Sequence, residues 1–265
     1  MRSTVRDSGM AGALVCLLIL GMLVTPFGCR EKGLEPSTLF EKATAATSSR
    51  RDALDAIRAL AELPGPDADS FLLHIAKGDV EATSALLQIE AVRAIASRGV
   101  PGSSAALASL IVPQTSFEVR REVVAAVRML GCDVACMKSV LHFLERSSWG
   151  EQTPEERLRE TLEAAETPAE VIDELEKIQE DASRRFKDEL YALVRDNSEA
   201  ALTVLIDTYG FRTGSPSSFG VQLAVTADLR EACPALVASK RTRDANSLRS
   251  AMPELDAALI SLECD

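Results

Sequence analysis

The chain has 265 residues, of which 46% are hydrophobic and 26% are charged, the balance of a folded globular protein. Its formal net charge of −11 disfavours binding to nucleic acid or to an anionic lipid surface, because both carry negative charge themselves. Only 4% of the residues are aromatic, whereas the strong helix formers Ala and Leu are abundant. Alternating runs of β-branched residues are nearly absent, so the sequence predicts an all-α fold.

Residues 1–28 have the features of a secretion signal. Arg2 and Arg6 give the segment a positively charged start, and the run that follows, 10–24, carries no charge. As a helix this run would rise roughly 22 Å, less than the roughly 30 Å hydrocarbon core of a bilayer. A short apolar run behind a basic start is typical of the h-region of a signal peptide.

The apolar run leads into residues 25–29, which read TPFGC. Gly28 directly before Cys29 resembles the lipobox of bacterial lipoproteins, in which the cysteine is lipidated and becomes the first residue of the mature chain. That family usually carries Leu and a small residue where this chain has Pro26 and Phe27. The resemblance implies a lipid anchor on Cys29 that holds the protein at the bacterial cell envelope, facing the periplasm. An ordinary secretory signal and an uncleaved anchor are the alternatives.

Residues 29–48 are expected to form a tether and one short helix. The polar segment 30–37 provides the tether. Thr38 and Glu41 have the spacing of a capping box, which predicts a helix over about 39–46.

Residues 49–146 contain a repeated helix pair. Its clearest copy is 87–111, where apolar residues at helical spacing are interrupted by a glycine-containing break at 99–102. The offset that superimposes 56–61 on 91–96 also aligns the apolar positions of the second helix. This shared offset predicts two successive units of the same structure.

A third copy begins at Val119, and two registers are open for it. The shorter offset places Gly99 on Gly131, whereas the offset of the first two copies places Arg93 on Arg128. We prefer the shorter one, because it also keeps the apolar positions of the second helix nearly aligned.

The three copies resemble the HEAT-like repeat family, in the short form of the phycobilisome-lyase type. That family's unit opens with Val-Arg, continues with alanines and a Leu, turns at Gly and closes with a Leu-rich helix. The positions that match are Val119, Arg120, Ala126, Val127 and Gly131 in the third copy and Ala91, Ala94, Ile95, Gly99, Leu107 and Ile111 in the second. The first copy lacks the Val-Arg pair. The resemblance implies an α-solenoid of stacked helical hairpins, because one pair cannot bury its apolar stripe alone; an irregular helical bundle is the alternative.

Arginines recur at equivalent points of the copies. Arg58 and Arg93, together with Arg120 or Arg128, are spaced to form a ladder of hydrogen bonds between neighbouring units. We interpret this ladder as structural rather than as a ligand site.

Residues 147–265 are expected to form an acidic, less regular helical region that either extends the solenoid or stands apart from it. Segment 151–189 holds 14 acidic and 6 basic residues, and an apolar stripe from Pro168 to Leu193 predicts a helix of some 25 residues. The acidic face opposite the stripe is interpreted as solvated, with a cation or a basic partner as the alternative. Two further helices are predicted near 221–239 and 244–262.

The sequence contains six cysteines. Cys16 lies in the signal and Cys29 is the lipidation candidate, which leaves four in an oxidising compartment: Cys132, Cys136, Cys233 and Cys264. Three pairings are possible. We favour 132–136 with 233–264, because residues four apart on a helix have Cα atoms about 6 Å apart. Zinc binding by the Cys-x3-Cys pair is the alternative, but the spacing is poor and no second pair or nearby histidine supports it.

These features favour a non-catalytic interaction or scaffold protein, lipid-anchored at the envelope, that binds a protein partner and needs no metal or cofactor. The family resemblance leaves two alternatives: an enzyme or cofactor-handling protein of the HEAT-like lyase type, and a purely structural envelope lipoprotein. A groove with exposed apolar residues would favour binding, whereas a deep pocket with converging polar groups would favour an enzyme.

Overall fold

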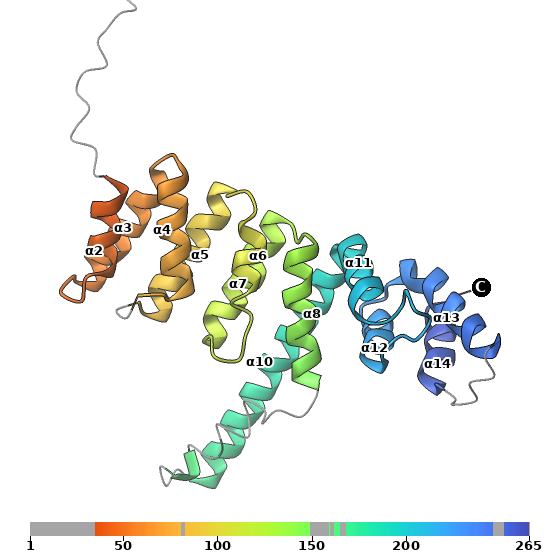
Figure 1. Ribbon diagram of the computed structural model, residues 1–265. Coiled ribbons are helices and arrows are strands. Elements are labelled where there is room, and N and C mark those ends of the chain that lie inside the picture. The colour runs from red at the N-terminus through yellow and green to blue at the C-terminus, as the bar shows by residue number, and fades with distance from the viewer. Residues whose placement is uncertain are drawn as a thin grey trace, which may run out of the picture. The chain divides into compact units, whose positions relative to one another are not determined.

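The computed structural model describes residues 35–80, 83–148, 159, 162–164, 168–245 and 252–264. Within these ranges all regular structure is helical, which confirms the all-α prediction (Figure 1). The predicted signal segment, residues 1–28, and Cys29 lie outside the described residues. Residues Pro36–Asp265 belong to one compact unit, to which the following description applies.

The N-terminal part of this unit is a succession of short helices. They are α2 (Pro36–Thr44), α3 (Arg50–Glu62), α4 (Pro66–Lys77), α5 (Ala85–Arg98), α6 (Ser103–Ala108), α7 (Phe117–Leu130) and α8 (Val134–Ser148). Helices α5 and α6 reproduce the predicted pair with its break. Helices α3, α5 and α7 start at Arg50, Ala85 and Phe117, so the longer offset holds between the first two units and the shorter one between the second and the third.

Local signals explain where these helices begin and end. Ser49 caps α3 by accepting a hydrogen bond from the Asp52 amide at 3.2 Å, and Ser116 caps α7 in the same way. Helix α5 ends at Gly99, which has a left-handed backbone with φ of 60°. Helix α2 begins at Pro36, earlier than predicted, because proline suits the first turn, where no amide proton is needed.

Alternate helices form two rows. In the first row α3, α5, α7 and α10 (Ala169–Asp196) contact one another in that order. In the second row α2, α4, α6, α8 and α11 (Ser198–Thr208) do the same. Contacts between the rows, such as α4 with α5 and α6 with α7, close the space between them. Each helix is therefore covered by neighbours from adjacent pairs as well as by its own partner.

The buried side chains of these helices form one continuous cluster. Helix α5 illustrates the packing: Ala91, Val92 and Ile95 are fully buried, and its small alanines permit close approach of the neighbouring helices. Leu72 in α4 and Leu107 in α6, which the offset between the first two copies aligns, are both fully buried. The repeat seen in the sequence is thus a repeat of core positions.

The C-terminal part departs from the predicted helices. Beyond α10 and α11 it contains α12 (Ser218–Thr226), the 3-10 turn η1 (Arg230–Ala232), α13 (Cys233–Ala245) and α14 (Pro253–Ser261). The predicted helix 221–239 was wrong: it is interrupted after α12, where Asp228 has a φ of 52°. Pro234 would also have stood in the interior of that helix, whereas it lies in the first turn of α13, where proline is tolerated.

The glycine that ends α5 provides a test of this backbone analysis. A Cβ placed on Gly99 has no neighbouring atom within 4 Å, so a side chain there would not clash. It would instead strain the backbone, which has a positive φ at this residue. We expect Gly99→Ala to lower the free energy of unfolding by about 1 kcal/mol, and Gly99→Asn to lower it less, because asparagine tolerates the left-handed region. Urea denaturation followed by circular dichroism measures both; equal losses for the two variants would contradict the assignment.

Candidate functional site

Two arginines make equivalent bridges along the first row. Arg58 Nε of α3 donates to Glu90 Oε1 of α5 at 2.8 Å. Arg93 of α5 donates through Nε and Nη2 to both carboxylate oxygens of Glu122 of α7, at 2.9 and 2.8 Å. Each arginine is the ninth residue of its helix and each glutamate is the sixth residue of the next. We call these two bridges the rungs.

The other two candidate ladder residues behave differently. The ninth residue of α7 is Ala125, so no third rung of this kind forms. Arg128, in the last turn of α7, instead donates to Asp196 Oδ2 at the end of α10, at 3.0 Å. This bond joins the repeats to the C-terminal part rather than to another repeat.

Arg120 lies among three aromatic rings. Its guanidinium carbon is 5.7, 5.6 and 5.6 Å from the ring centroids of Phe117, Phe143 and Phe186, which belong to α7, α8 and α10. The Phe186 ring meets the other two edge-on. Cation–π attraction is strongest where the charge is desolvated, and here it draws three helices together. Arg120 therefore fixes the middle of α10 on the repeats.

A further arginine, Arg98, links three helices and was not identified from the sequence. It is the last residue of α5 and only 16% of its side chain is exposed. Its Nε bonds Asp69 of α4 at 2.7 Å, and its Nη1 donates to the carbonyls of Ala61 and Leu63 at 2.7 and 2.6 Å. These carbonyls end α3, so one side chain ties α3, α4 and α5 together. The corresponding residue of α7 is Leu130. Because the arginine does not recur at this position, comparing the copies in the sequence did not point to it.

The structure joins the four cysteines in the two favoured pairs. Cys132 and Cys136 are linked by a bond of 2.08 Å and Cys233 and Cys264 by one of 1.98 Å, with Cα separations of 5.3 Å in both cases. The first pair joins the turn between α7 and α8 to the first turn of α8, and the second joins the start of α13 to the chain after α14. Both bonds brace helix ends.

The α7–α8 turn is also tied to the junction of α10 and α11. Asn197 at that junction accepts a hydrogen bond from the Cys132 amide at 3.2 Å and donates to the Leu193 carbonyl at 2.8 Å. Within the described residues, no group of three or more His, Cys, Asp or Glu side chains is arranged to hold a metal ion.

Ionisable groups show the effect of these contacts. The hydrogen bonds to Glu90 and Glu122 raise the pKa of Arg58 and of Arg93 respectively, so both rungs stay charged. Burial, assisted by the negative charge of Glu145, raises the pKa of Tyr209, whose hydroxyl donates to that carboxylate at 3.1 Å. Each shift favours the protonation state that the contact requires.

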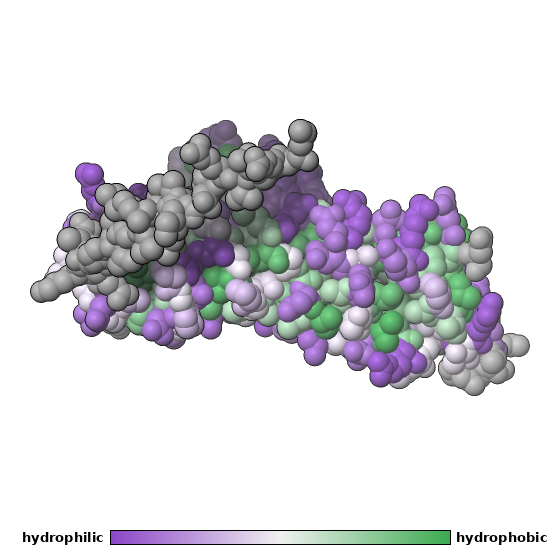
Figure 2. Space-filling model, turned by 90° about the horizontal axis from the view of Figure 1, so that it is seen from above, coloured by the Kyte–Doolittle hydropathy of each residue, from purple (hydrophilic) through white to green (hydrophobic). Residues whose placement is uncertain are grey.

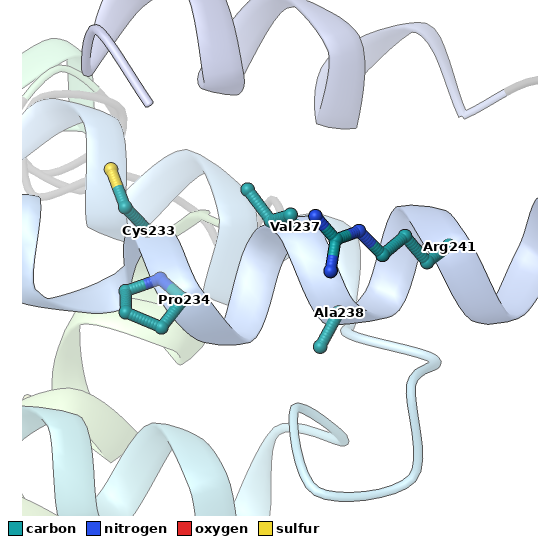
Figure 3. Close-up of a pocket in the computed structure, with 5 residues that line it drawn as sticks. All are labelled: Cys233, Pro234, Val237, Ala238 and Arg241. Carbon is teal, nitrogen blue, oxygen red and sulfur yellow. The ribbon is translucent and has the colours of Figure 1, made fainter. Parts of the chain in front are cut away.

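A cavity of about 480 Å³ lies along one face of α13 (Figure 3). Its lining residues are Cys233, Pro234, Val237, Ala238 and Arg241. The sulfur of Cys233 is already engaged in a disulfide, and Arg241 supplies the one charged group of this lining. The cavity therefore combines a mainly apolar lining with one guanidinium.

Large apolar side chains remain exposed at several places. They are Val112, Met129, Val134, Val171, Ile178 and Ile260, with exposed fractions from 36% to 79%. On the face seen in Figure 2, hydrophobic residues alternate with hydrophilic ones over the coloured surface. Single exposed apolar residues are ordinary, but Val171 and Ile178 occur on the same helix, α10, two turns apart. This part of α10 therefore carries an exposed apolar stripe.

No helix in the described part of the chain is both long and apolar enough to cross a bilayer. Cys29, the lipidation candidate, lies outside the described residues. No family model, curated protein or solved structure matches the sequence.

The contrast between Arg98 and Arg93 can be measured. Replacing Arg98 with Leu leaves Asp69 and two carbonyls without their donor, and we expect a loss of about 2–4 kcal/mol in the free energy of unfolding. The matched variant Arg93→Leu removes a rung whose arginine is 58% exposed, and we expect about 0.2–1 kcal/mol. Urea denaturation measures both, and a rung variant that costs as much as Arg98→Leu would refute the ranking.

The two disulfides differ in the length of chain that they close. The sequence separation is 31 for Cys233 and Cys264, whereas it is 4 for Cys132 and Cys136. The loop-entropy relation gives about 4 kcal/mol for the first bond and about 2 kcal/mol for the second. We expect the double variant Cys233→Ala/Cys264→Ala to lose more stability than Cys132→Ala/Cys136→Ala, measured by denaturation without reductant. The reverse order would contradict the entropic argument.

Proposed function

We propose that this protein is a non-catalytic scaffold that binds a protein partner at a bacterial cell envelope, to which a lipid on Cys29 anchors it. The observation that carries the proposal is the pair of helix rows, in which successive helix pairs share one core and are linked by the rungs. We infer from this packing an α-solenoid like that of HEAT-like repeat proteins, a class whose long surface suits protein recognition. The exposed apolar stripe of α10 supports binding further.

The anchor fits the layout of the chain. The first helix, α2, begins at Pro36, a short distance along the chain after Cys29. Fully extended, the segment between them spans at most about 25 Å, so a lipid at Cys29 would hold the helix rows close to the membrane. The net charge of −11 gives little attraction to an anionic membrane, so a covalent lipid is the more suitable means of attachment.

Labelling with radioactive palmitate tests the anchor. We expect the full chain to be labelled and to sediment with membranes, and Cys29→Ala to be unlabelled, because the thiol that would carry the lipid is removed. The control is Cys16→Ala, which lies within the signal and should be labelled like the wild type. Equal labelling of Cys29→Ala would overturn the lipid anchor.

Photo-cross-linking in cells tests the binding function. A photoreactive amino acid is placed in the full chain at Lys77 of α4, Lys138 of α8 or Ile178 of α10, all exposed positions on different helices. We expect light-dependent adducts with another protein at one position or more, because a scaffold holds its partner against its surface. Absence of such adducts at all three positions would overturn the scaffold function.

A further inference from the structure

Helix α10 divides into a half that packs in the common core and a half that lies outside that core. From Phe186 onward its buried side chains, Phe186, Leu190, Leu193 and Val194, join the common core. Before Phe186, Ile172 is the one buried side chain among the described residues of the helix. Figure 1 shows this first half, residues 169–185, extending beyond α7 and α8. We call it the free half of α10.

An apolar stripe follows one face of the free half. Val171 is 44% exposed and Ile178 is 59% exposed, and the partly buried Leu175 and Ala182 lie between and after them. These four residues are spaced by four, three and four, so on a helix they lie within about 60° of one another. The stripe spans roughly 16 Å. This is the spacing of side chains that receive a second helix.

The carboxylates of the free half fall into two groups. Arg159 donates to Glu176 and Asp173 at 2.6 and 3.0 Å, and both carboxylates lie on the side of the helix away from the stripe. The hydrogen bond from Arg159 lowers the pKa of Glu176, so this pair stays charged and satisfied. Asp173 and Glu176 are therefore already paired with an arginine of the same chain.

The carboxylates beside the stripe remain available. Glu174 follows Val171 by three positions and precedes Ile178 by four, which makes it a neighbour of both on the helix surface. Glu170 lies one turn earlier on the same edge. Both are exposed, and neither has an ion-pair partner among the described residues. Residues 168–185 contain six acidic and three basic side chains, so the surroundings of the stripe are negative.

We propose that the free half of α10 docks a basic amphipathic helix of a partner protein. Apolar side chains of that helix would cover Val171, Leu175 and Ile178, and its Lys or Arg residues would meet Glu170 and Glu174. The proposal rests on the scaffold function and names the surface and the chemistry of the partner. Charge complementarity carries it, since the stripe is bordered by two exposed carboxylates that form no ion pair within the described part of the chain, and acidic side chains outnumber basic ones around them.

The same charges disfavour other occupants. A second copy packed antiparallel on the stripe would bring Glu174 toward the acidic edge of its twin. An anionic lipid surface would be repelled by the same edge. A basic helix satisfies both the apolar stripe and the carboxylates.

The test uses the full chain in phosphatidylcholine nanodiscs and two fluorescent synthetic helices. Both peptides carry Leu at the positions that face the stripe; one carries Lys at the flanking positions and the other carries Glu. We expect the Lys helix to bind at least about tenfold more tightly than the Glu helix, with an affinity that falls as salt rises. Fluorescence anisotropy measures both, with empty nanodiscs as the blank.

Three variants locate the binding site. Ile178→Glu should weaken binding of the Lys helix at least about tenfold. Ile260→Glu makes an equivalent change at an exposed residue of α14 and should change the affinity for the Lys helix less than about twofold. Glu170→Lys/Glu174→Lys should reverse the preference between the two peptides. Circular dichroism checks that each variant is folded.

Several outcomes would overturn the docking proposal. Two of them are equal binding of the Lys and Glu peptides and an equal loss of affinity in Ile178→Glu and Ile260→Glu. A third is self-association of the chain that Ile178→Glu abolishes, because a second copy would then be the occupant of the stripe. Cross-links at Lys77 or Lys138 together with no binding of the Lys helix would reject this site and leave the scaffold function standing.

Discussion

The structure depends on apolar helix faces that only neighbouring helix pairs can cover. Helix α5 is buried by α3 and α7 in its own row and by α4 in the other, so no single pair holds a complete core. Polar contacts then fix how adjacent helices are aligned. The rungs lie at the exposed edge of one row, whereas Arg98 binds the ends of α3 and α4 from a nearly buried position.

The junction between the repeats and α10 uses a different mixture of forces. Aromatic rings from three helices surround Arg120, and a disulfide, Asn197 and the bond from Arg128 to Asp196 hold the same region from the side. These contacts hold residues 186–196 of α10 in place, so the free half of the helix can extend beyond α7 and α8. A helix held firmly at one half can present the other half to a partner.

Periodic features of this fold could be predicted from the sequence, and singular ones could not. The helical class, the break at Gly99 and the long helix after Pro168 follow from spacing and capping, which depend on nearby residues. Arg98 has no counterpart in other units, and the environment of Arg120 depends on Phe186, which is remote from it in the sequence. The break at Asp228 requires a left-handed aspartate, for which the local sequence gives only a weak signal.

The positions of the rungs also bear on how such a chain can change in length. The arginine at the ninth position of one helix bonds the glutamate at the sixth position of the next helix in the row. A helix that has both residues can therefore form one rung with the helix before it and another with the helix after it. A duplicated copy of α5 inserted ahead of α7 would therefore find the partners of both its rungs in place. After α7 the series is closed, because Ala125 replaces the arginine and its neighbour in the row is α10. Helix pairs can therefore be added on the N-terminal side of α7, and the surface carried by α10 stays unchanged.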